Sequence, residues 1–123
     1  LELSSVPLAG GASVLLHALS LGDVTTFRIA ADSSRVVTRA DANQDELFEL
    51  FSGPLDGSAP FERLNRPLPT GGDVQTDFVP LADGRAVYRA DQEEDNVVEL
   101  FTAFLAHAPR QAATPTQTRS VGQ

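Results

Sequence analysis

Hydrophobic residues occur in short runs along the chain, and turn-forming residues separate these runs about every 8 to 12 positions. Within the best-defined stretch, the pattern predicts strands at 24–30, 35–40, 47–55 and 61–64. Proline and glycine residues in 67–72 interrupt the pattern and predict a loop to the next set of strands. This spacing is typical of antiparallel, all-β proteins.

The strand pattern repeats within the chain. The run that begins at Arg35 returns at Arg85, a shift of 50 residues, and a gap of one residue extends the match back to Phe27 and Phe78. Periods of about 20 to 50 residues are typical of stacked structural units. The identical pairs of the main match are Val37/Val87, Arg39/Arg89, Ala40/Ala90, Asp41/Asp91, Asp45/Asp95, Glu49/Glu99, Leu50/Leu100 and Phe51/Phe101.

The repeat divides the chain into units of about 50 residues. Glu2 and Leu3 match Glu49 and Leu50, so residues 1–22 are predicted to be the C-terminal half of a unit. Residues 23–72 are predicted to form a complete unit, and 73–108 a partial one. Residues 109–123 are rich in Pro, Thr, Gln and Ser, which predicts a disordered tail. We therefore expect the chain to be a fragment of a longer array.

A helix is the competing interpretation for 97–107, where helix-forming residues are frequent. Equivalent positions of a repeat are expected to fold alike. The segment equivalent to 97–105 is 47–55, which contains Gly53 and Pro54, and proline disrupts a helix interior. The repeat thus favours a strand in both units.

The order of several motifs resembles the TolB-type WD-like β-propeller repeat. These motifs are Ala-Asp-Gly-Arg at 82–85, Val-Tyr-Arg-Ala-Asp at 87–91, Glu-Leu-Phe at 99–101 and Pro-Leu-Asp-Gly at 54–57. The resemblance implies about two four-stranded antiparallel blades, an incomplete propeller, because propellers have about four to eight blades. It also implies a bacterial, periplasmic or extracellular protein that serves as a protein-interaction scaffold.

Partners implied by this resemblance are another protein, the remaining blades of a parent chain, or further copies of this chain. One alternative is a gating or accessory propeller of a larger enzyme, such as a prolyl-oligopeptidase-like serine peptidase. The sequence contains no Gly-x-Ser-x-Gly nucleophile motif, so we expect the chain itself to be non-enzymatic and to use no cofactor.

Composition narrows the possible partners. The net charge is −8, which repels nucleic acid, and the apolar runs are shorter than the ~20 residues of a membrane span. Cysteine is absent, which excludes disulfides and thiolate metal sites. The two histidines, His17 and His107, have no partner at metal-binding spacing and are expected at the surface or in loops.

The acidic segments after the second strand of each unit suggest calcium binding as a third interpretation. Oxygen-bearing side chains alternate there in the spacing of the first ligands of an EF-type loop, although the glycine of that loop is missing. The competing interpretation is that Asp and Asn stabilise turns by bonding to local backbone amides. The candidate calcium ligands are Asp41, Asn43, Asp45, Asp91, Glu93 and Asp95.

Arg39 and Arg89 precede these acidic segments, and Glu49 and Glu99 lie on the next strand. We expect a cross-strand Arg–Glu pair in each unit, a common stabilising contact between neighbouring strands.

Overall fold

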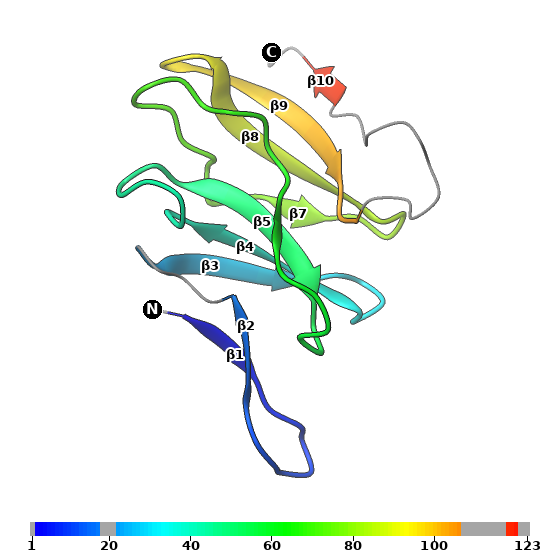
Figure 1. Cartoon of the computed structure of the whole chain (residues 1–123). Coiled ribbons are helices and arrows are strands. Elements are labelled where there is room, and N and C mark those ends of the chain that lie inside the picture. Colours follow the sequence, from blue (N-terminus) through cyan, green and yellow to red (C-terminus); the bar gives the residue numbers. More distant parts are fainter. Residues whose placement is uncertain (1, 18–21, 107–117, 121–123) are drawn as a thin grey trace.

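The computed structural model describes residues 2–17, 22–106 and 118–120, which contain ten β-strands and no helix. All strand pairs are antiparallel, which confirms the predicted all-β class. Figure 1 shows three sheets that follow one another through the molecule. The first contains β1 (Leu3–Ser5) and β2 (Val14–His17).

The second sheet has the order β3-β4-β5-β6, so each strand pairs with its neighbour in sequence. Its strands are β3 (Val24–Ile29), β4 (Arg35–Ala40), β5 (Glu49–Pro54) and β6 (Glu62–Arg63). All four correspond to predicted strands, and the bounds of β4 agree with the prediction. Residues 31–34 form the turn between β3 and β4, where Ser33 has φ of 62°.

The third sheet repeats this arrangement. It contains β7 (Val79–Pro80), β8 (Arg85–Glu94) and β9 (Val97–Phe104), with β10 (Thr118–Ser120) at the edge of β9. The helical interpretation of 97–107 is therefore wrong for the residues of β9. Residues 107–117 and 121–123 of the tail region lie outside the described residues.

Strand β10 was not predicted, because its residues belong to the segment expected to be disordered. Arg119 pairs with Phe101, and in the preceding unit Arg63 of β6 pairs with Phe51. Since Phe51 and Phe101 are equivalent, β10 occupies the register position of a fourth strand. A strand supplied after a long connection has no local repeat signal, which explains why the sequence pattern did not reveal it.

Alternating side chains give each four-stranded sheet two faces. We call the face directed at the following unit the forward face and the opposite one the rear face. On β4 and β5, Val37, Arg39 and Leu50 lie on the forward face, whereas Thr38 and Phe51 lie on the rear face. Both faces of these strands are largely buried, so their polar residues as well as their apolar ones lie within the molecule.

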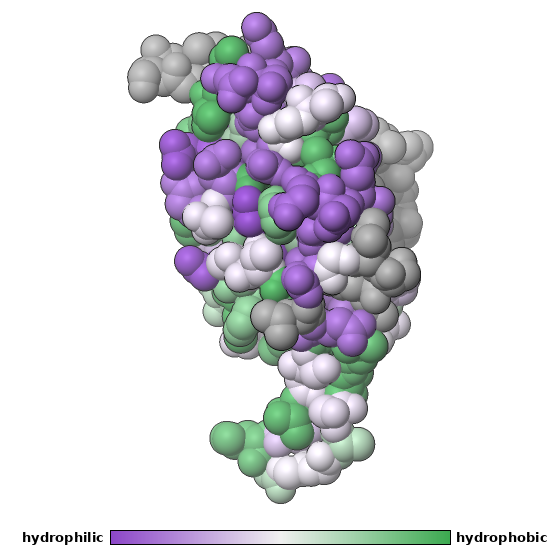
Figure 2. Space-filling model, turned by 90° about the vertical axis from the view of Figure 1, so that its left-hand side faces the viewer, coloured by the Kyte–Doolittle hydropathy of each residue, from purple (hydrophilic) through white to green (hydrophobic). Residues whose placement is uncertain are grey.

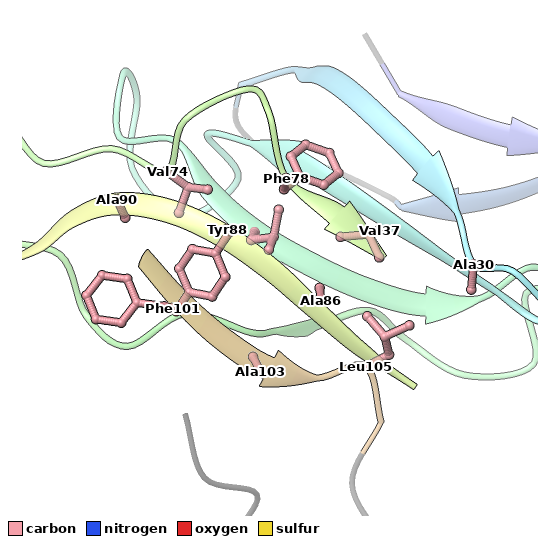
Figure 3. Close-up of a cluster of buried hydrophobic side chains, with 11 residues drawn as sticks. Ala30, Val37, Val74, Phe78, Ala86, Tyr88, Ala90, Phe101, Ala103 and Leu105 are labelled. Atoms are coloured by element: carbon pink, nitrogen blue, oxygen red, sulfur yellow. The ribbon is translucent and has the colours of Figure 1, made fainter. Parts of the chain in front are cut away.

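The main core lies between the forward face of the β3–β6 sheet and the rear face of the β7–β10 sheet (Figure 3). Tyr88 and Phe101 stack with ring centroids 5.5 Å apart, and Phe78 is fully buried beside them. Burying one such aromatic side chain contributes roughly 1.5–3 kcal/mol. The other buried members of the cluster are Ala30, Val37, Leu50, Val74, Ala86, Ala90, Ala103 and Leu105.

The described strands form open sheets, without a closed or propeller arrangement. The structure thus confirms the predicted all-β class with antiparallel sheets, whereas the arrangement of these sheets as propeller blades stays a prediction. Among the described residues there is also no helix long and apolar enough to cross a membrane.

Equivalent leucines provide a direct test of this core. Leu50 is fully buried between the sheets, whereas Leu100 is 37% exposed on the forward face of the next sheet. We expect Leu50→Ala to lower the free energy of unfolding by about 2–5 kcal/mol, because it leaves a cavity. Leu100→Ala is the matched control and should cost much less. Urea denaturation of both variants measures the difference, and equal losses would contradict the assigned core.

Candidate functional site

Asp41 and Asp91, the first residues of the two acidic segments, bind backbone amides in the same way. The carboxylate of Asp41 accepts hydrogen bonds from the amides of Asp23 (2.6 Å) and Glu46 (3.0 Å). The carboxylate of Asp91 accepts equivalent bonds from Asp73 (2.7 Å) and Asn96 (3.0 Å). Each carboxylate thereby joins the entry of its unit to the hairpin between the second and third strands.

These bonds affect the charge state of Asp91. Burial alone would raise the pKa of this carboxyl group, but the backbone amides of Asp73 and Asn96 donate to its charged form and hold the pKa below its usual value. Gly22 packs so closely on Asp41 that a Cβ atom there would overlap the carboxylate. Both observations agree with the turn-stabilising interpretation of the first aspartate in each segment.

The other candidate calcium ligands are dispersed. Asn43 donates to Glu49 (3.1 Å), and Asp95 accepts from the side chain of Asn96 (3.1 Å). Asp45 and Glu93 are exposed, and 91–94 continue strand β8 instead of forming the predicted turn. Among the described residues, no group of three or more His, Cys, Asp or Glu side chains could hold a metal ion. Calcium binding stays a prediction that the sequence alone motivates.

The expected Arg–Glu pairs are wrong for the first unit, and the register explains why. Arg39 lies opposite Leu50, whereas Glu49 lies opposite Ala40, so the two charged side chains are on different faces of the sheet. Arg39 instead donates from Nε to the carbonyl oxygen of Val74 (2.6 Å) in the next unit.

The side chain of Arg39 makes two further contacts. Its Nη1 donates to Thr25 Oγ1 (3.1 Å), and its guanidinium carbon lies 4.2 Å from the centre of the Phe48 ring. In the second unit, Arg89 forms an exposed ion pair with Asp77 (2.9 Å). The two equivalent arginines therefore have different partners. The hydrogen bond from Arg39 to the Val74 carbonyl oxygen connects the two units.

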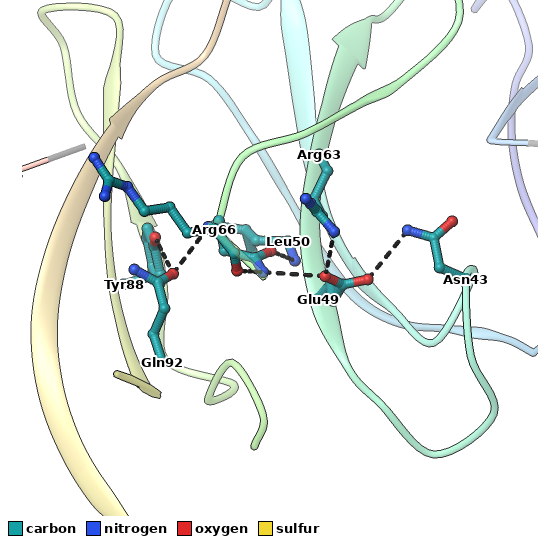
Figure 4. Close-up of polar contacts among 8 residues, drawn as sticks. Asn43, Glu49, Leu50, Arg63, Arg66, Tyr88 and Gln92 are labelled. Carbon is teal, nitrogen blue, oxygen red and sulfur yellow. Dashed lines mark hydrogen bonds and ion pairs between the residues drawn. The ribbon is translucent and has the colours of Figure 1, made fainter. Parts of the chain in front are cut away.

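Glu49 is the centre of a buried polar network (Figure 4). Its carboxylate accepts hydrogen bonds from Asn43, Arg63 and Asn65 at 3.1–3.2 Å. The Asn65 side chain also accepts from the Leu50 amide (2.8 Å).

The network continues into the next sheet. The Arg66 amide and the Tyr88 hydroxyl both donate to Gln92 Oε1, at 3.1 and 2.9 Å. Burial raises the pKa of Tyr88, which keeps this hydroxyl protonated as a donor. These polar groups fix the two sheets relative to each other.

His17 is buried, contrary to the expectation of a surface or loop position. Its ring stacks on Phe61 with centroids 4.7 Å apart and contacts Phe51 at 4.9 Å. Its Nδ1 lies 3.1 Å from Thr38 Oγ1. His17 thus attaches the β1–β2 pair to the rear face of the β3–β6 sheet. The second histidine, His107, lies outside the described residues.

A groove of about 710 Å³ separates the remainder of the β1–β2 pair from the same rear face. Its lining is mainly apolar and includes Leu3, Val14, Leu16, Phe27, Ile29 and Val36. Figure 2 shows apolar residues gathered on the projecting end of the molecule at the bottom of the view, and hydrophilic residues over its middle and upper part. We call the groove between the β1–β2 pair and the β3–β6 sheet the rear groove.

A second apolar surface occupies the other end of the molecule. It is formed by alternate residues of β9 together with β7, on the forward face of the third sheet. Its most exposed large residues are Val79 (52%), Val98 (40%), Leu100 (37%) and Phe104 (46%). We call this set the open forward face.

No protein-family model matches the chain, and no curated protein or solved structure matches it either. The function is therefore inferred from the rear groove and the open forward face. Sequence reasoning missed both surfaces. The repeat identifies Leu50 and Leu100, or Phe27 and Phe78, as equivalent, but it does not reveal which member of each pair is covered.

The role of the first acidic residue can be tested against a neighbour. We expect Asp41→Ala to lower the free energy of unfolding by about 1–3 kcal/mol, because the backbone amides of Asp23 and Glu46 lose their acceptor. Asp45→Ala is the matched control; its side chain is exposed, so stability should hardly change. Thermal or urea denaturation compares them. Equal effects would show that Asp41 does not stabilise the hairpin.

Burial gives His17 a measurable pH signature. Its pKa is lowered from 6.5, so the unfolded chain takes up a proton at a higher pH than the folded chain. The stability that the neutral His17 contributes is therefore fully present above pH 6.5. It is lost as the pH falls through the lowered pKa of His17 in the folded chain. His17→Phe keeps an aromatic ring but removes this titration.

We expect the stability of the wild type relative to His17→Phe to fall below pH 6.5, by at most about 1.4 kcal/mol per pH unit. Urea denaturation of both proteins from about pH 7.5 to about pH 5, in steps of about half a unit, measures this difference in stability. A difference that does not change with pH would contradict a buried, neutral His17.

Proposed function

We propose that this chain is a segment of a propeller-type repeat array and acts as a non-enzymatic scaffold for protein interaction. The observation that carries the proposal is the open forward face. In the preceding unit, Val37 and Leu50 on the same face are completely buried by another sheet. A surface that already binds one sheet within the molecule is suited to bind another protein surface where it is open.

The composition of the open forward face supports this function. Monomeric proteins expose single apolar side chains everywhere, but adjacent ones on one sheet face indicate an interaction site. Val98, Leu100 and Phe104 alternate along one strand, so their side chains share a face. Val79 of β7 lies opposite Val87 of β8, which lies opposite Thr102 of β9, so Val79 shares this face two strands away.

Electrostatics favours protein over nucleic acid as the partner. The chain carries a net charge of −8, and a phosphate backbone would be repelled. The resemblance to TolB-type repeats supports the same function, because propeller blades pack face to face with their neighbours. The most accessible partner for a test is a second copy of the chain.

The proposal predicts self-association through the open forward face. At high concentration the wild type should exceed the monomer mass of 13.1 kDa, whereas Val98→Asp should stay monomeric, because it places a charge within the contact. Val97→Asp is the matched control, since Val97 is 44% exposed on the opposite face of the same strand. Light scattering over a concentration series measures the mass.

Two results would contradict the proposal. One is a wild type that stays at 13.1 kDa over the whole series. The other is an equal loss of association in Val97→Asp and Val98→Asp, which would indicate contact through some other surface. Far-ultraviolet circular dichroism of each variant verifies that the β-structure is retained.

A further inference from the structure

The rear groove has an open strand edge beside it. Strand β5 pairs with β4 on one side and β6 on the other. Its equivalent by the repeat is β1, which among the described residues pairs with β2 alone. The position that β4 occupies beside β5 is therefore not filled beside β1. A strand edge with free backbone donors and acceptors can pair with an added strand.

Phe27 and Phe78 show what that missing strand would cover. Phe27 lies on β3 and Phe78 directly precedes β7, the first strand of its unit, and both side chains point to the rear face. Phe78 is completely buried by the forward face of the preceding sheet, whereas Phe27 is 48% exposed and Ile29 beside it is 49% exposed. The same position in the repeat is thus covered in one unit and open to the rear groove in the other.

The segment that covers Phe78 defines the chemistry of a suitable partner. It is the hairpin β3–β4, which supplies three contacts to the following unit. The Arg28 guanidinium lies 5.6 Å from the centre of the Phe78 ring. Val37 belongs to the core cluster around Phe78, and Arg39 donates to the carbonyl oxygen of Val74.

Moving these contacts back by one unit places them on the rear groove. The position of Phe78 becomes that of Phe27, and the position of Val74 becomes that of Val24. An arginine would then cover Phe27, a valine would enter the groove near Val36, and a second arginine would reach the Val24 carbonyl. The hairpin itself would pair with the free edge of β1.

We propose that the rear groove binds a β-hairpin of the repeat's inner-strand type, with arginines at the positions of Arg28 and Arg39 and a valine at that of Val37. This inference rests on the proposed repeat organisation, but it concerns the opposite end of the molecule from the open forward face. The bound hairpin adds a strand to β1 and buries Phe27 and Ile29.

The chain supplies the hairpin for the test. Leu1 is equivalent to Phe48, so residues 23–47 are fused directly in front of Leu1 and the whole chain is kept. Hydrogen exchange followed by NMR then compares the β1 amides with and without the added segment. We expect exchange of these amides to slow by about tenfold or more, because carbonyl oxygens of the added strand accept their hydrogen bonds or the strand shields them from water.

The matched control carries Val37→Asp and Arg39→Ala in the added copy only. It has the same length as the fusion but lacks the groove contacts, so hydrogen exchange of the β1 amides should return to the rate of the original chain. If the fusion and its control protect β1 equally, or if neither protects it, the inference is overturned.

Coupling to Phe27 provides a second readout. Phe27→Ala should reduce the folding equilibrium constant of the fusion about tenfold more than that of the original chain, because Phe27 is buried only in the fusion. An equal reduction in both would show that the added segment does not cover Phe27, and would overturn the inference.

A cyclised peptide of residues 24–40 keeps the test decisive if the fusion folds poorly. We expect it to shift the NMR signals of the Phe27 ring and the β1 amides, and its Val37→Asp version to leave them unchanged. Identical spectra with both peptides would overturn the inference. The proposed function fails separately, since a Val98→Asp variant with unaltered self-association would reject it without affecting the groove.

Discussion

Packing of apolar side chains between the two larger sheets is the interaction on which the rest of the structure depends. Phe78, Tyr88 and Phe101 of the second unit pack against Val37 of the first (Figure 3), and Leu50 belongs to the same buried cluster. Each sheet has apolar residues on both faces, so neither could be stable alone in water. Stacking buries the apolar side chains between the two sheets, but apolar side chains at the two ends of the molecule stay exposed.

Polar groups then determine how the stacked sheets are positioned. Arg39 reaches the Val74 carbonyl of the following unit, and Glu49 anchors a network that continues through Asn65 to Gln92 (Figure 4). Buried polar groups are costly unless they are paired, so these contacts favour one arrangement of the sheets over others. They explain why charged residues occur in strands that are otherwise apolar.

The repeat is more regular in its turns than in its contacts between units. Asp41 and Asp91 bind equivalent amides, and the equivalent residues Glu46 and Asn96 both have positive φ, 62° and 66°. Leu50 and Leu100, in contrast, differ from full burial to 37% exposure. Local structure follows the sequence of one unit, whereas burial depends on whether another unit lies beside it. The open surfaces proposed as binding sites thus lie where none of the described sheets covers the repeat.

The sequence by itself determined the all-β class, the antiparallel strands of each unit and the bounds of β4, because alternation and turn residues are local properties. It also identified Asp41 and Asp91 as candidates either for stabilising a turn or for binding calcium. Only the tertiary structure decided that His17 is buried, that Arg39 binds the next unit instead of Glu49, and that β10 pairs with β9. These features depend on register and on contacts between residues distant in the chain. A pattern of residues assigns a side chain to one face of a strand, but the neighbouring sheet decides what that face contacts.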